Sequence, residues 1–401
     1  MGTALPLPRT ADAVTERAVA GSKRRWLALD LLRFAAVILM VQGHLFYVVL
    51  DEALRTERWY GYHAYVHGFT APLFLFASGA AFGITTLDKW ADHSRWGRPV
   101  AKRFERYLII VGIGYLLHLG QLELSWLLRL PDERLMRTTR VDALQHIGVT
   151  LLFVEALALL LKRKALFLGV LGLFGVAVVA SAPWVWGWEL RHAPIPLAAY
   201  VNASTGSMFP IVPWAGFLVL GLLTAAWVQR RRERVPFGLR QLAVPLAVVS
   251  ALLLAAGHGM TRLGFDPFPE HNYWKTSPWF FLVRAGVVLG VLAVLCAVDV
   301  ALRHRQRAPW VRLLQTIGSQ TLVIYVAHLL VLYGSGVAPG LGTRWDRNLG
   351  LAESSALAVA LLLAMGLLGW VWDRTKRQHP VAFDRVRYAA TAALVLVFML
   401  R

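Results

Sequence analysis

Apolar runs of about 20 residues, separated by short polar segments, recur along almost the whole chain. A helix needs about 20 apolar residues to cross a hydrocarbon core that is about 30 Å thick. The pattern predicts about eleven spanning helices, near residues 27–49, 68–87, 106–121, 143–161, 165–186, 210–228, 241–260, 279–300, 311–333, 352–372 and 388–400. The predicted fold class is therefore an all-α, polytopic integral membrane helix bundle.

The chain is expected to contain one membrane domain. Residues 1–25 are hydrophilic and are predicted to form a cytoplasmic N-terminal tail, and residues 26–401 form the transmembrane domain. The apolar run after the tail continues to Leu50 and lacks a small-x-small cleavage site, so it is interpreted as a retained first helix and not a signal peptide.

Basic residues give the predicted orientation. With the N-terminus in the cytoplasm, the inner segments contain about 28 Lys and Arg residues and the outer ones about 11. Cytoplasmic loops are enriched in such residues. The N-terminus is therefore predicted to be cytoplasmic, which in a bacterium places the chain in the inner membrane.

Composition supports a membrane protein and argues against nucleic-acid binding. The chain is 57% apolar and only 16% charged, which is too apolar for a soluble protein of 401 residues. Its net charge is +19, but the basic residues form short clusters between apolar runs, such as Lys162-Arg163-Lys164. The expected partner is thus the lipid bilayer and not nucleic acid. The sequence leaves a homodimer open.

Most of the histidines lie toward the predicted outer face. With the orientation above, nine of the 12 histidines fall in outer loops or outer helix ends: His44, His63, His67, His118, His146, His192, His258, His271 and His328. His44 is about 26 Å along the first helix from Leu27. An imidazole can simply lie at the lipid interface, but polar groups within a span usually face the bundle interior.

Two helices carry pairs of ionisable residues. In the first helix, Asp30 and Arg33 are spaced i,i+3 and share a face with His44. An ion pair that only stabilises packing is the alternative to a functional role. At the start of the fourth helix, Asp142 and His146 are spaced i,i+4, so a hydrogen bond that orients the imidazole is expected. A helix N-terminal acid beside an interfacial histidine is the alternative.

The ninth predicted helix places Gly318, Thr321, Tyr325 and His328 on one face. This face is interpreted either as part of a polar site or as a packing contact. The stretch Ser78–Gly83 in the second helix is expected to allow close helix packing. No HExxH, Cys/His cluster, Walker or GxGxxG pattern is present, so no metal and no tightly bound cofactor is expected.

Five segments in chain order carry a further signal: Leu29–Ala36 running to Met40 and His44, Ala71–Gly79, Asp142–Gly148, Phe209–Gly216, and Ile317–Leu322 running to His328. Together they resemble the heparan-α-glucosaminide N-acetyltransferase-like family, within the transmembrane acyltransferase superfamily. Phe34 stands where the family usually has Gly, and His146 stands where Arg is common.

The resemblance implies transfer of an acyl group, expected to be acetyl, from cytosolic acyl-CoA to an acceptor at the outer face, often a sugar or glycan. The acceptor hydroxyl or amine needs a base near neutral pH, which histidine can supply. The candidate catalytic residues are His44, His67, His146 and His328, with Asp142 as the orienting carboxylate. An acyl-histidine intermediate and direct transfer both stay open.

Acetyl-CoA, or another acyl-CoA, is expected as the donor substrate. Its phosphates need cations, and the candidates are Arg33 with its partner Asp30, Arg103 and Arg106. The same arginines also satisfy the positive-inside pattern. The alternative function is a multi-pass transporter or exporter of a small molecule or envelope precursor. The sequence shows no inverted repeat and no pair of Gly- or Pro-broken helices to favour it.

Overall fold

The computed structural model describes residues 26–234, 239–263, 266–334 and 338–400. The predicted tail, residues 1–25, lies outside the described residues. The described chain is helical, and its only β contacts are isolated bridges, one between Leu50 and Leu349 and one between Gly334 and Pro339. The all-α prediction is confirmed.

Within the residues that the structure describes, seven helical segments are long and apolar enough to cross a membrane. They are α2 (Leu27–Val49), α4 (Arg58–His67) together with α5 (Thr70–Leu87), α10 (Ala143–Leu161), α14 (Ile211–Arg234), α15 (Leu239–Arg262), α17 (Pro278–Ala301) and α21 (Leu351–Gln378). Taken together, α18 (Pro309–Ser319) and α19 (Thr321–Tyr333) have the length and composition of an eighth span.

The expected number of about eleven spans is not confirmed. α7 (Arg98–Leu116) carries Arg98, Lys102, Arg103 and Arg106 in its first half, and α11 (Lys164–Ala180) has only 17 residues. α22 (Pro380–Leu400) starts earlier than expected and has charged residues in its first two turns. Charge and length thus separate these three helices from the others.

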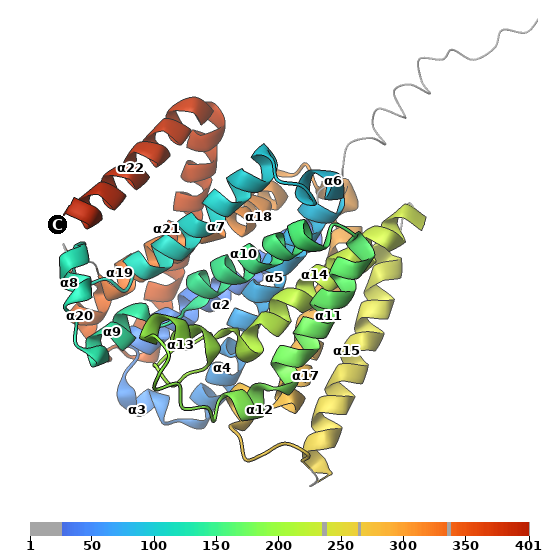
Figure 1. Ribbon diagram of the computed structural model, residues 1–401, viewed down its shortest axis with the longest axis horizontal. Coiled ribbons are helices and arrows are strands. Elements are labelled where there is room, and N and C mark those ends of the chain that lie inside the picture. The colour runs from blue at the N-terminus through green and yellow to red at the C-terminus, as the bar shows by residue number, and fades with distance from the viewer. Residues whose placement is uncertain (1–25, 235–238, 264–265, 335–337, 401) are drawn as a thin grey trace, which may run out of the picture.

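Short helices connect the long ones: α3 (Glu52–Arg55), α6 (Trp90–His93), α8 (Leu124–Leu128), α9 (Asp132–Thr139), α12 (Ala182–Val185), α13 (Ile195–Val201), α16 (Tyr273–Thr276), α20 (Leu341–Trp345) and the 3-10 turn η1 (Arg303–Arg305). We call the end of the bundle at which α2 begins the proximal end and the end at which α2 stops the distal end. In Figure 1, α3, α4, α9, α12 and α13 gather at the distal end, and α6 lies at the proximal end.

Close glycine contacts hold α5 against α14. A Cβ atom on Gly79 would overlap the backbone oxygen of Leu218, and one on Gly221 would overlap the backbone oxygen of Phe76. Each glycine therefore lets the partner backbone approach. The predicted packing role of the Ser78–Gly83 stretch is confirmed. α2 lies centrally and packs against α5, α17, α18, α19 and α21.

The predicted span 311–333 is broken. α18 and α19 meet at an angle of 70°, so Gly318 does not share one continuous helix face with Tyr325 and His328. Gln320 takes a non-helical conformation at the break, and its side-chain amide donates to Asp373 of α21 at 3.1 Å. The backbone amide of Gln320 still donates to the carbonyl oxygens of Thr316 and Ile317, and its side chain ties the break to α21.

Candidate functional site

His44 of α2 and His328 of α19 form the centre of the candidate site. His44 Nδ1 lies 2.9 Å from His328 Nε2, and His328 Nδ1 lies 2.9 Å from the carbonyl oxygen of Ile324. A carbonyl only accepts, so Nδ1 of a neutral His328 carries the hydrogen and its Nε2 accepts from His44 Nδ1–H. This chain of contacts leaves Nε2 of His44 without a proton and able to accept one.

α4 adds two histidines next to this pair. The ring of His67 rests on Gly43, where a Cβ atom would overlap the imidazole. The rings of His63 and His67 are 4.1 Å apart between centroids, and Gln42 contacts Nε2 of His63 at 3.0 Å. The structure therefore brings the predicted residue His67 beside His44. Neither Gln42 nor His63 was predicted as a site residue, although the i,i+4 spacing of His63 and His67 was visible in the sequence.

Asp142 is the N-cap of α10 and accepts a hydrogen bond from the Ala143 amide at 2.9 Å. Its carboxylate lies 3.6 Å from His118 Nε2. Burial raises the pKa of Asp142, but the hydrogen bond and charge of His118 outweigh it, so the pKa lies below its ordinary value. The predicted contact between Asp142 and His146 is wrong, because the Asp142 carboxylate caps the backbone amides of the first turn of α10 and lies next to His118.

His146 instead contacts the carbonyl oxygen of Phe209 through Nδ1 at 3.0 Å. It is fully buried, and its Nε2 has no hydrogen-bond partner among the described residues. The structure thus separates His146 from Asp142 and joins it to the segment that leads into α14.

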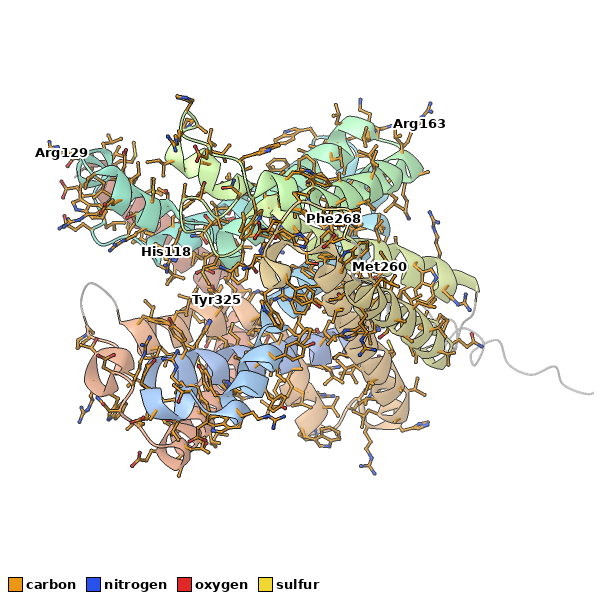
Figure 2. All side chains as sticks on the ribbon, turned by 90° about the horizontal axis from the view of Figure 1, so that it is seen from below. His118, Arg129, Arg163, Met260, Phe268 and Tyr325 are labelled. Atoms are coloured by element: carbon orange, nitrogen blue, oxygen red, sulfur yellow. The ribbon has the colours of Figure 1, made fainter. Side chains whose placement is uncertain are left out.

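A small cavity connects α7 and α10 with α19. It is lined by Gly114, Leu117, His118, Asp142, Leu144, Gln145, Tyr325 and Leu329. Figure 2 labels two of these lining residues, His118 and Tyr325. The Tyr325 ring meets the His328 ring edge to face, with centroids 5.7 Å apart. Tyr325 therefore lies between the cavity and the histidine pair.

The other predicted residues of α2 lie toward the proximal end. Arg33 Nη1 lies 3.5 Å from the buried carboxylate of Asp30, as the i,i+3 spacing predicted. Arg33 Nη2 also donates to the carbonyl oxygen of Ala77 at 3.4 Å. The 14 residues from Asp30 to His44 span about 21 Å of helix. The structure therefore holds this ion pair well away from the histidines.

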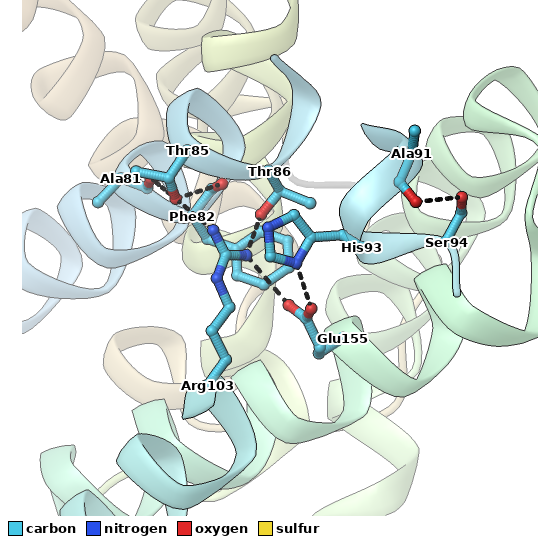
Figure 3. A network of polar contacts seen from close by, with 9 residues as sticks. All are labelled: Ala81, Phe82, Thr85, Thr86, Ala91, His93, Ser94, Arg103 and Glu155. Atoms are coloured by element: carbon cyan, nitrogen blue, oxygen red, sulfur yellow. Dashed lines mark hydrogen bonds and ion pairs between the residues drawn. The ribbon is translucent and has the colours of Figure 1, made fainter. Parts of the chain in front are cut away.

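Arg103 belongs to a buried polar cluster near the proximal end (Figure 3). It donates to Glu155 at 3.1 Å and to the Thr85 hydroxyl at 3.0 Å, and Glu155 contacts His93 Nδ1 at 2.7 Å. Glu155 is fully buried. Arg106 is exposed on the same helix. Arg103 thus already has a carboxylate partner, and a role of either arginine in CoA binding stays a prediction.

Within the described ranges, no group of three His, Cys, Asp or Glu side chains is arranged to hold a metal ion.

The model of the family described as "Heparan-alpha-glucosaminide N-acetyltransferase, catalytic" matches residues 25–255 and 235–330. The chain belongs to this family. The resemblance predicted from five sequence segments is confirmed, and membership in the heparan-alpha-glucosaminide N-acetyltransferase family indicates an acetyltransferase. None of the curated proteins matches the chain.

The region that matches the heparan-alpha-glucosaminide N-acetyltransferase family includes the whole candidate site. His44, His67, Asp142 and His328 all fall inside it, and so does the proximal pair of Asp30 with Arg33. The long apolar helices fit the multi-pass membrane protein that a membrane acetyltransferase requires.

Proposed function

We propose that the chain transfers an acyl group, expected to be acetyl, from acyl-CoA to an amine or hydroxyl of a sugar or glycan at the distal end. The contact between His44 and His328 is the observation that supports this most strongly, because it presents an unprotonated imidazole nitrogen inside the bundle. The family name describes transfer to the amine of an alpha-glucosaminide, so an amino sugar is the first acceptor to test.

The chemistry needs one base. The acceptor nitrogen or oxygen attacks the thioester carbonyl, and His44 Nε2 takes the proton that the acceptor loses. Collapse of the tetrahedral intermediate breaks the C–S bond, and the same proton passes to the leaving thiolate of CoA. The products are the acylated acceptor and free CoA. In the second route, His44 Nε2 attacks the carbonyl first, the C–S bond breaks and CoA leaves as its thiolate. The acceptor then attacks the acyl-imidazole, the bond from Nε2 to the acyl carbon breaks, and the proton that the acceptor loses passes to the CoA thiolate, which regenerates neutral His44.

The donor is proposed to enter from the proximal end, which we propose faces the cytoplasm. Arg33 and Arg106 supply positive charge for phosphate groups there. The 11 residues between Arg33 and His44 rise about 16 Å along α2. The extended pantetheine arm of CoA is the part of the donor that would cover this distance.

The test supplies the purified full-length protein with radiolabelled acetyl-CoA and glucosamine. We expect release of CoA and labelled N-acetylglucosamine. His44→Gln should lower turnover by about 10²- to 10⁴-fold, because it removes the base. His192→Gln is the matched control, since His192 is exposed in the distal loop between α12 and α13 and should leave turnover unchanged.

The proposal would be contradicted if the wild-type protein left acetyl-CoA intact in the presence of every sugar in a panel of amino and neutral sugars. Uptake of those sugars into protein-containing vesicles, with the thioester intact, would favour the transporter instead. Equal turnover by His44→Gln and wild type would remove His44 from the reaction.

A further inference from the structure

Arg284 is a cation inside the membrane-spanning helix α17. Among the described residues it makes no hydrogen bond and no ion pair, and its Nε atom is buried without a partner. The other end of α17 is fixed by Asp299, which accepts from the Ala28 amide at 3.3 Å. Arg284 lies 15 residues earlier, about 22 Å along the helix. This cation is therefore at the distal end of the bundle, with the histidines.

Aromatic rings surround the guanidinium. Its carbon lies 4.3 Å from the ring centroid of Phe280 and 5.3 Å from that of Trp214. The ring of Phe280 also packs against Trp274 and Tyr65. Aromatic faces attract a cation, but they offer no lone pairs to its five N–H donors. An intramembrane cation without an acceptor is unfavourable by itself and commonly marks a ligand path.

Arg284 lies next to the segment that carries His67, which is beside the proposed base, His44. A Cβ atom on Gly68 would lie 3.8 Å from Nη2 of Arg284. Gly68 follows His67 in the chain, and the ring of His67 rests on Gly43, the neighbour of His44. The guanidinium and the histidines are thus parts of one region where α4 turns into α5.

Two more buried donors in this region have no acceptor among the described residues. They are the indole Nε1 of Trp214, whose ring lies under the guanidinium, and the hydroxyl of Thr70, two residues after Gly68. Three buried groups that can donate, with no protein acceptor for them, match the needs of an anion.

We propose that Arg284, assisted by Trp214 and Thr70, binds an anionic substituent of the acceptor, namely a carboxylate, phosphate or sulfate on the sugar. This inference rests on the proposed function, because it assigns the acceptor to the distal end. The phosphates of CoA have the same chemistry, but Arg33 and Arg106 lie at the proximal end proposed for the donor. The acceptor is therefore the source to which the geometry points.

The first experiment measures binding without acetyl-CoA. Full-length protein in lipid nanodiscs is titrated calorimetrically with glucosamine and with glucosamine 6-phosphate. The wild type should bind the phosphorylated sugar at least about 10-fold more tightly, because the phosphate gains charge-assisted hydrogen bonds. Arg284→Gln should abolish this difference, and Arg284→Lys should retain part of it.

Arg58→Gln is the matched control, because Arg58 is exposed on α4 at the same end. It should leave the preference unchanged. Equal wild-type affinities for the two sugars, or a preference that survives in Arg284→Gln, would overturn the proposal. The wild-type comparison and the lysine variant keep the test valid if Arg284→Gln does not fold.

The second experiment separates the two sources of the anion. Steady-state kinetics should show kcat/KM falling about 10-fold more for the phosphorylated acceptor than for glucosamine in Arg284→Gln. A tenfold rise of the KM for acetyl-CoA with glucosamine as acceptor would assign Arg284 to the donor and overturn the inference. Absence of acetyl transfer would refute the proposed function, whereas the calorimetric result would still decide the anion site.

Discussion

The interaction of His328 with His44 determines which imidazole nitrogen is available for chemistry. His328 is fully buried and donates to the carbonyl of Ile324, so its other nitrogen must accept from His44. Fixing the tautomer of a base in this way leaves one orientation for proton transfer. In the proposed mechanism, His328 is therefore a positioning residue, and His44 is the group that meets the acceptor.

Replacing His328 tests this relation. His328→Leu removes the acceptor for His44 Nδ1–H and should lower kcat by about 10-fold or more, with KM for both substrates nearly unchanged. His328→Gln retains an acceptor oxygen and should recover part of the loss. The measurement is steady-state kinetics over a range of pH for both variants.

Equal losses in the leucine and glutamine variants, with the pH profile of kcat unchanged in both, would contradict a positioning role. They would show that His328 serves only to fill space in the bundle.

The sequence predicted individual site residues better than their partners. His44 and His328 stood out from their positions on apolar helices, but their contact joins residues 284 positions apart and depends on how α2 and α19 pack. The local rule for i,i+4 pairs failed at Asp142, because that residue is an N-cap and its partner, His118, lies just after the end of α7. Arg284 carries no sequence motif, and only its surroundings distinguish it.

At the scale of elements, the cluster around Glu155 joins four helices. Glu155 of α10 contacts Arg103 of α7 and His93 of α6, and Arg103 also reaches Thr85 of α5. Removing one partner of a buried ion pair destabilises a protein by more than the intact pair stabilises it, because the remaining charge is buried without a partner. This cluster therefore fixes the relative positions of the helices near the proximal end.

Glu155→Leu should destabilise the protein by about 3–5 kcal/mol, because Arg103 is left without its carboxylate. The double variant Arg103→Met with Glu155→Leu should recover most of that loss. Thermal unfolding in nanodiscs measures both. A double variant no more stable than Glu155→Leu would contradict this account.

In the double variant, a raised KM for acetyl-CoA would support the predicted CoA role of Arg103, and an unchanged KM would assign Arg103 to packing alone.

Hydropathy predicted the positions of several helices closely, and α2 has the expected bounds, Leu27–Val49. It failed at the break between α18 and α19, because the contact that satisfies Gln320 comes from Asp373, 53 residues away. Apolar runs report where a helix is stable in lipid. They do not report where a side-chain contact with a neighbouring helix holds a bend in place.

At the scale of the whole molecule, polar sites lie toward both ends of one apolar bundle. α2 alone has 23 residues, about 34 Å of helix, with Asp30 and Arg33 near its start and His44 near its end. The proposed function places donor binding near one end and acceptor binding near the other. It therefore requires the acetyl group to leave acetyl-CoA on one side of the membrane and reach an acceptor on the other.

Vesicles with a defined protein orientation test this requirement most directly. Glucosamine is enclosed in the vesicles, radiolabelled acetyl-CoA is added outside, and the protein is inserted with its proximal end facing outward. The account predicts labelled N-acetylglucosamine inside the vesicles with wild-type protein and its loss with His44→Gln. Labelled product formed only when both substrates are on the same side, or acetyl-CoA that stays intact in every arrangement, would contradict it.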